Sequence, residues 1–205
     1  MVKKIRKNLE KRPDLLTIID IIPNNVKILD LGCGNGSLLK LLKLEKNVRG
    51  LGVEISQDKI LECAEMGINV IHEDLNEGLK IFADKSFDFV LLSQTLQALQ
   101  NPDLVLQEMV RVGKKGIISF INIGHISSRA QLFFQGKMPE TKTIPNPWYN
   151  TPNIHLATIK DFKKLCKDKN LKIDMEIPLC QSFDFLAKFW PNLFAPTCVF
   201  VVSQA

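Results

Sequence analysis

The sequence predicts an α/β fold built on a doubly wound, mostly parallel sheet of seven strands. Short apolar segments alternate with amphipathic ones five times between residues 26 and 121. These apolar segments are rich in Val, Ile and Leu, as expected for parallel strands that are covered on both faces. The chain has 205 residues, a length that suits one domain with a sizeable core. We therefore expect a single domain over residues 1–205.

The strand and helix limits follow from the apolar periodicity and from residues that end helices. Residues 14–22 are expected to form a helix that stops at Pro23. A second helix begins at Ser37, directly after a glycine-rich turn. Strands are expected at residues 26–31, 47–54, 68–72, 87–92, 116–121, 171–177 and 197–202. We expect the last strand to run antiparallel to its neighbours.

Capping residues place three further helices. These run from Ser56 to Gly67, from Asn101 to Gly113 and from Thr158 through Cys166. Ser56 is a good N-cap residue and Gly67 a good C′ residue. Pro102 occupies the first position of its helix, where a missing N–H costs nothing. Thr158 and Asp161 have the spacing of a capping box.

Residues 122–154 interrupt this alternation. The segment contains four prolines and several aromatic residues, which are Phe133, Phe134, Trp148 and Tyr149. A segment of this length inside a domain is usually functional or disordered, and its aromatic content argues against disorder. We therefore predict a Pro-rich, aromatic loop insertion. Trp148 and Tyr149 could cover a cleft, cage a cationic ligand, contact a partner or pack within the loop.

The composition argues against several functional classes. The net charge is +5, and the densest basic group lies at residues 3–12. That group could contact a phosphate-rich partner, but we favour a solvated, frayed N-terminus. No apolar run approaches the ~20 residues of a membrane span, and the N-terminus lacks the apolar core of a signal peptide. Five cysteines without a C-x-x-C pair argue against zinc or redox chemistry and fit a cytoplasmic protein.

The main chemical signal begins at Asp30, where the first strand runs into alternating glycines. Such a turn lets the backbone approach a ligand closely, and a strand, a glycine turn and a helix typically open a nucleotide site. The spacing is G-x-G-x-G rather than the G-x-G-x-x-G of dinucleotide sites. Asp30 would repel a pyrophosphate but could pair with a cationic ligand. The turn contributes Gly32, Cys33, Gly34, Asn35 and Gly36 to the predicted site, and we expect Cys33 to act as filler.

Two further carboxylates follow the second and third strands. Glu54 lies 22 residues after Gly32, where a carboxylate accepts hydrogen bonds from ribose hydroxyls. Asp74 could accept from an adenine amino group while Leu75 packs on the ring, and Ile55 lies beside Glu54. Together they predict a cleft for a nucleoside without phosphates, which S-adenosylmethionine fits. The alternative is that these carboxylates are ordinary polar residues at strand ends.

Residues 26–112 resemble the class I S-adenosylmethionine-dependent methyltransferase fold, which is Rossmann-like. Three segments also resemble the MetW family of methionine-biosynthesis proteins. They are Val48-Arg-Gly-Leu-Gly-Val-Glu54, Ser86-Phe-Asp-Phe-Val-Leu-Leu-Ser-Gln-Thr-Leu-Gln97 and Trp148-Tyr-Asn-Thr-Pro-Asn-Ile-His-Leu156. The resemblance runs from about Pro23 to Ile177. One departure is at residues 122–126, where the family tends to place aromatic residues around Gly-His.

The resemblance implies a protein that acts with homoserine O-acyltransferase, as a partner subunit or regulator that binds S-adenosylmethionine or S-adenosylhomocysteine. The complete cleft keeps an alternative open, which is a methyltransferase that acts on a small metabolite. The two classes differ in turnover, because only the enzyme would transfer labelled methyl groups. Whether the chain is an enzyme therefore stays open.

Candidate catalytic residues are few. Ser93 and Gln94 follow the fourth strand, where Gln94 could contact the methionyl end of the ligand but is a poor base. This position lacks the Asn/Asp-Pro-Pro-aromatic run that amino-methylating nucleic-acid enzymes use, which argues against a DNA substrate. His125 and His155 could act as general bases. Equally, each could hold a loop by hydrogen bonds to the backbone, which is the interpretation that we favour.

Overall fold

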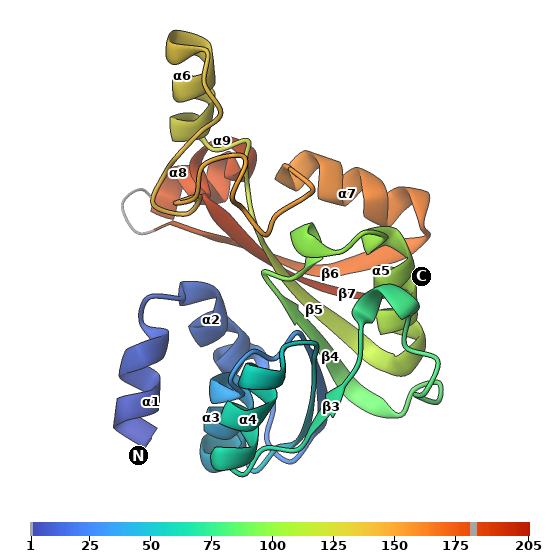
Figure 1. The fold of residues 1–205 in the computed structure, drawn as a ribbon. Coiled ribbons are helices and arrows are strands. Elements are labelled where there is room, and N and C mark those ends of the chain that lie inside the picture. Colours follow the sequence, from blue (N-terminus) through green and yellow to red (C-terminus); the bar gives the residue numbers. More distant parts are fainter. Residues whose placement is uncertain (1, 181–183) are drawn as a thin grey trace.

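The computed structural model describes residues 2–180 and 184–205, and its core is a seven-stranded sheet (Figure 1). The strands are β1 (Lys27–Leu31), β2 (Arg49–Glu54), β3 (Val70–His72), β4 (Phe87–Ser93), β5 (Gly113–Ile121), β6 (Leu171–Leu179) and β7 (Thr197–Gln204). Their order is β3-β2-β1-β4-β5-β7-β6. The first five pair in parallel, and β7 runs antiparallel to both β5 and β6. This confirms the predicted fold class and the direction of the last strand.

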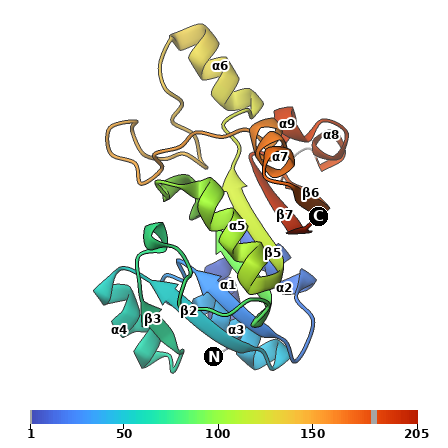
Figure 2. The same ribbon diagram turned by 90° about the vertical axis from the view of Figure 1, so that its right-hand side faces the viewer.

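Helices cover both faces of the sheet, as Figure 2 shows from the side. One face carries α1 (Val2–Leu9), α2 (Pro13–Ile21), α3 (Ser37–Lys46) and α4 (Gln57–Glu65). The other carries α5 (Pro102–Val112) and α7 (Ile159–Asp168). The shorter elements are η1 (Leu75–Glu77), η2 (Leu96–Ala98), α8 (Asp184–Phe189) and α9 (Pro191–Phe194).

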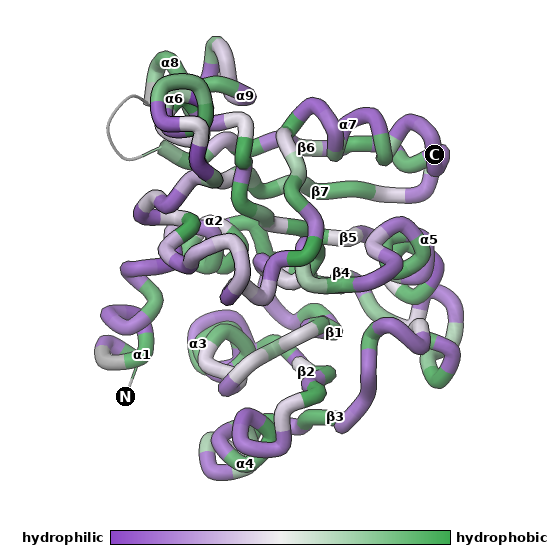
Figure 3. Tube along the Cα trace, turned by 45° about the horizontal axis from the view of Figure 1, so that its top comes forward, coloured by the Kyte–Doolittle hydropathy of each residue, from purple (hydrophilic) through white to green (hydrophobic). Residues whose placement is uncertain are grey.

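The core is divided by the sheet into two apolar layers, because successive strand residues point to opposite faces. On β1, Leu29 faces α5 and α7, whereas Ile28 faces α2 and α3. The α7 side contains three packed rings, Phe120, Phe162 and Phe200, with centroids 4.6 to 5.9 Å apart. Hydrophobic residues accordingly follow the central strands, while the surrounding helices mix both kinds (Figure 3).

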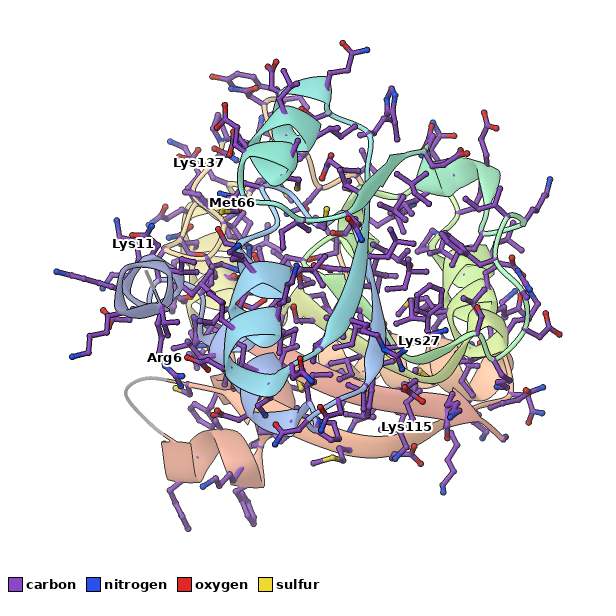
Figure 4. The ribbon with its side chains drawn as sticks, turned by 90° about the horizontal axis from the view of Figure 1, so that it is seen from below. Arg6, Lys11, Lys27, Met66, Lys115 and Lys137 are labelled. Atoms are coloured by element: carbon purple, nitrogen blue, oxygen red, sulfur yellow. The ribbon has the colours of Figure 1, made fainter. Side chains whose placement is uncertain are left out.

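The N-terminal residues differ from the sequence prediction. Val2–Leu9 form α1 rather than a frayed end. Arg6 Nη1 lies within hydrogen-bond distance of both oxygens of the Glu45 carboxylate on α3, at 2.9 and 3.0 Å, and this ion pair links α1 to α3. Figure 4 shows Arg6 and Lys11 on the opposite side of the molecule from Lys27 and Lys115.

The insertion also differs from the predicted loop, because ten of its residues form helix α6 (Ile126–Gln135). This helix stands away from the body of the fold in both ribbon views (Figures 1 and 2). His125 caps its first turn and Gly136, with a φ of 62°, ends it. The prolines that suggested a loop all lie after the helix, at positions 139 to 152.

The capping box of α7 gives a direct test of the local structure. Thr158 Oγ1 accepts from the Asp161 N–H at 3.2 Å, and the Asp161 carboxylate accepts from the Thr158 N–H at 3.0 Å. Thr158→Ala should lower the free energy of unfolding by about 1 kcal/mol, because an N–H of the first turn loses its acceptor. Urea unfolding measures this difference. Thr158→Ser keeps the hydroxyl and should recover most of the loss; an alanine variant as stable as wild type would contradict the assignment.

Candidate functional site

The predicted site residues meet at the carboxyl edge of the parallel strands, where ligands bind in open α/β sheets. The glycine turn is fixed to β2 by two hydrogen bonds, from the Gly32 and Cys33 N–H groups to the Val53 carbonyl, at 2.9 and 3.1 Å. Gly32, Gly34 and Gly36 all have positive φ, which favours glycine. A Cβ built at Gly34 would meet nothing within 4 Å. The centre of the turn therefore faces open space in which a ligand could lie.

Glu54 is held rigidly at the end of β2. Its Oε2 accepts from the Gly34 N–H at 2.8 Å, and its Oε1 accepts from the Ile55 and Ser56 N–H groups at 2.9 and 3.0 Å. A carboxylate can accept about four hydrogen bonds, so these three leave it capacity for a ligand hydroxyl. The same contacts orient the carboxylate toward the glycine turn.

Asp30 is the most unusual group of the site. It is 1% exposed, and its Oδ1 has no hydrogen-bond partner within the described chain. Burial raises the pKa of Asp30 to about 7, while the Arg12 guanidinium acts to lower it and the Glu54 carboxylate to raise it further. An unpartnered buried carboxylate is costly, and a cationic group of a ligand would relieve that cost.

The edge of β2 and β3 carries three further predicted site residues, which are Asp74, Leu75 and Ile55. Asp74 caps η1, and its Oδ1 accepts from both the backbone and side-chain nitrogens of Asn76 at 2.9 Å. Both bonds fall on one oxygen, so Oδ2 keeps its acceptor capacity. Leu75 is buried, whereas Ile55 is 59% exposed. An exposed apolar side chain beside two carboxylates suits the face of an uncharged aromatic ring.

Ser93 and Gln94 border the cleft at the end of β4. Gln94 has a φ of 54°, which is uncommon for a residue with a side chain, and its N–H donates to the Ser119 carbonyl at 2.9 Å. The next residue, Thr95, lies against the glycine turn, since a Cβ at Gly32 would come within 2.7 Å of its Oγ1. The ends of β1 and β4 are thus packed against each other.

The remaining turn residues have structural contacts. Cys33 is 9% exposed, and its Sγ lies 4.0 Å from that of Cys63. Burial, followed by the neighbouring Asp30, raises the pKa of the Cys33 thiol, so the side chain is a filler rather than a nucleophile. Asn35 Oδ1 accepts from the Ser37 N–H at 3.2 Å, at the start of α3.

Sequence reasoning missed a charged group beneath the cleft. Arg12 donates two hydrogen bonds to Asp14, at 2.9 and 2.8 Å, and Asp14 also accepts from Ser119 Oγ at 2.7 Å. Asp14 is completely buried, whereas the Arg12 side chain is 36% exposed. Arg12 is also the cation that acts on the pKa of Asp30. The Arg-Pro-Asp sequence at the start of α2 was the available signal.

Both candidate histidines form local hydrogen bonds, His125 with the first turn of α6 and His155 with the backbone at Gln100. His125 Nδ1 lies 2.7 Å from Ser127 Oγ and accepts from the Ser127 N–H at 3.3 Å, and burial lowers the pKa of its imidazole. His155 Nε2 lies 3.3 Å from the Gln100 carbonyl. These contacts match the loop-holding interpretation of both residues.

Comparison with known families identifies the chain. The model of the family "Methionine biosynthesis protein MetW" matches residues 12–202. The chain belongs to the MetW family. A bifunctional methionine biosynthesis protein MetXA/MetW of Rhodopirellula baltica is 40% identical over 170 residues, which are 78% of this chain and 27% of that protein. This MetW family member thus spans about a quarter of the length of that relative. An uncharacterized protein of Methanocaldococcus jannaschii is 32% identical over 73% of this chain and 67% of its own.

Solved structures share the fold of this MetW family member. A SAM-dependent methyltransferase from Archaeoglobus fulgidus is similar with a TM-score of 0.68 and 21% identity, covering 98% of this chain and 97% of its own. A SAM-dependent methyltransferase from Thermotoga maritima, described as a possible histamine N-methyltransferase, has a TM-score of 0.67 and 16% identity. The similarity covers 97% of this chain and 90% of that protein. Across residues 2–180 and 184–205, no helix is long and apolar enough to cross a bilayer.

Proposed function

We propose that this protein binds S-adenosylmethionine or S-adenosylhomocysteine and acts with, or regulates, homoserine O-acyltransferase in methionine biosynthesis. The observation that carries the partnership is the Rhodopirellula baltica relative, in which a segment 40% identical to this chain belongs to a protein named MetXA/MetW. Fusion of two activities in one chain supports a physical association where the two are separate. The proposal locates the protein in the cytoplasm, where its cysteine thiols would stay reduced.

The residues present fit an adenosyl ligand. Glu54, fixed by three backbone N–H groups, would accept from a ribose hydroxyl. Asp74 would accept from the adenine amino group, with Leu75 and Ile55 against the ring. The unpartnered Oδ1 of Asp30 is buried in this structure, so it would meet the ammonium of the methionyl end after a local movement on binding. Gln94 and Ser93 would border that end.

The ligand's role as a signal follows from its chemistry. Methionine is the precursor of S-adenosylmethionine, so a protein that binds the adenosyl compound and contacts the acyltransferase could report the state of the pathway.

A methyltransferase that acts on a small metabolite is the second candidate. The fold shared with SAM-dependent methyltransferases at 14 to 21% identity favours it. When bound, S-adenosylmethionine would supply an electrophilic methyl group. The chain's own contribution would be to orient the ligand through Glu54 and Asp30 and to bring an acceptor next to Gln94.

An assay of purified homoserine O-acyltransferase with and without this protein tests the proposal. We expect the acyl-transfer rate to change severalfold when the protein is added, and the change to depend on S-adenosylmethionine or S-adenosylhomocysteine. In a parallel incubation with methyl-labelled S-adenosylmethionine and homoserine-related metabolites, we expect no labelled product. An unchanged acyl-transfer rate would overturn the partnership, and labelled product would favour the methyltransferase.

A further inference from the structure

Helix α6 exposes apolar side chains that a folded chain normally buries. Phe133 and Phe134 are 82% and 80% exposed. Among the ten residues of α6, all of which the structure describes, only Ser128 is buried. A helix of this length is marginal in water without tertiary packing. Exposed apolar surface of this kind marks an interaction site.

The second part of the same insertion exposes two further aromatic residues. Trp148 and Tyr149 are 71% and 75% exposed and contact each other edge to face, with centroids 5.8 Å apart. The two parts are tied together, because Gln131 on α6 exchanges two hydrogen bonds with the backbone of Glu140, at 2.8 and 3.0 Å. We call the surface formed by Leu132, Phe133, Phe134, Met138, Trp148 and Tyr149 the α6 surface.

A pocket of about 280 Å³ opens beside the α6 surface. Met138 and Trp148 belong to both, and Ile121, Ile144 and Leu156 form further apolar walls. None of the described residues that line it is ionisable. The pocket therefore suits an uncharged apolar side chain, and a buried anchor surrounded by aromatic contacts is the usual centre of a protein interface.

Basic residues outnumber acidic residues around the α6 surface. Residues 126–142 contain Arg129, Lys137 and Lys142 but a single acidic residue, Glu140. Arg129 donates to the Gly124 carbonyl at the base of α6. A partner with an acidic rim around an apolar centre would be complementary.

The pocket lies close in sequence to a predicted ligand-binding residue. Gln97, which is 3% exposed, lines the pocket and follows Gln94 by three residues. Its carbonyl accepts from the Ile154 and His155 N–H groups at 2.9 and 3.0 Å, and its Oε1 accepts from the Ile121 N–H at 3.0 Å. The segment after β4 thus joins Gln94, a predicted ligand-binding residue, to the wall of the pocket.

We propose that the α6 surface and its pocket are the docking site for homoserine O-acyltransferase, which places an apolar side chain in the pocket and acidic groups opposite the basic rim. This rests on the proposed function. The acyltransferase is preferred to a second copy of this chain for two reasons. The relative in Rhodopirellula baltica joins the two activities in one polypeptide, and two copies would bring like basic rims together.

Binding of purified acyltransferase to the full chain and its variants tests this site. Phe133→Asp/Phe134→Asp and Trp148→Ala should each raise Kd at least tenfold, as loss of central aromatic anchors does. Leu61→Asp is the matched control, since Leu61 is 64% exposed on α4, at the far end of the molecule (Figure 1), and should leave Kd unchanged. Thermal unfolding of each variant should match wild type, because none of the replaced side chains is buried.

The outcomes separate the two proposals. If wild type binds the acyltransferase and the α6-surface variants bind it equally well, the docking site is wrong and the partnership stands. Wild type that does not bind would overturn the partnership and the docking site with it. A size measurement in solution tests whether the α6 surface instead binds a second copy of this chain. If the variants convert a dimer of this chain to a monomer without affecting acyltransferase binding, the surface joins two copies and the proposal is wrong.

Discussion

Replacement of Glu54 by alanine is expected to weaken S-adenosylhomocysteine binding at least a hundredfold. The variant loses the acceptor proposed for a ribose hydroxyl, and a hydrogen bond to a charged group contributes about 1.5–3 kcal/mol. It also releases the Gly34, Ile55 and Ser56 N–H groups that the carboxylate holds at 2.8 to 3.0 Å, so the glycine turn keeps only its two backbone hydrogen bonds to Val53. A hundredfold change corresponds to about 2.7 kcal/mol. Titration calorimetry measures it.

Two variants make the Glu54 result specific. Glu62→Ala removes a carboxylate that forms a surface ion pair with Lys59 on α4, and should leave ligand affinity unchanged. Glu54→Gln keeps the shape of the side chain but replaces one acceptor oxygen with a donor, so it should bind with intermediate affinity. If Glu54→Ala binds the ligand as tightly as wild type while remaining folded, the cleft assignment is wrong.

The sheet could be predicted because its signals are local. Each strand is a short apolar run, and the helix ends depend on single residues, such as Gly67 with its φ of 67° or the Thr158–Asp161 capping box. The carboxyl edge of the sheet then follows from the strand directions. Glu54 and Asp74 lie 20 residues apart in the sequence, yet both follow strands that pair in parallel, which brings their positions to one edge.

Contacts between distant side chains were beyond such reasoning. The hydrogen bond from Ser119 to Asp14 joins residues 105 positions apart, and no spacing rule predicts it. Helix α6 was missed for a different reason. Its apolar residues are exposed rather than confined to one buried stripe, so the periodicity that indicates a core-facing helix is weak. The feature that hid α6 from sequence analysis is the same one that favours an interaction with a partner.

Asp30→Asn should stabilise the unliganded protein and weaken ligand binding at the same time. The folded pKa of Asp30 is raised from 3.8 to about 7, mainly by burial, so the fold favours the protonated form. Below pH 4 the Asp30 carboxyl is protonated in both the folded and the unfolded protein, so no charge is buried on folding. Between pH 4 and 7 the unfolded chain ionises first and stability falls, and above pH 7 the cost is complete. Asparagine removes this cost, so the variant's advantage should grow from pH 4 to 7 and level off at up to about 4 kcal/mol.

The ionised Asp30 carboxylate, which destabilises the free protein, should favour ligand binding. An ammonium group beside Oδ1 stabilises the ionised carboxylate, so wild type should release a proton on binding below pH 7, and its affinity for S-adenosylhomocysteine should fall as the pH is lowered from 8 to 6. Asp30→Asn should bind at least tenfold more weakly at pH 8, with little dependence on pH in this range. Urea unfolding from pH 4 to 9 and calorimetry in buffers of different ionisation enthalpy measure both effects. A variant less stable than wild type at pH 8 would contradict the buried-charge account, whereas unchanged affinity would show that Asp30 does not contact the ligand.

A buried charge that destabilises the free protein and favours the bound one is expected of a binding residue, because a purely structural carboxylate would have acquired a partner within the fold.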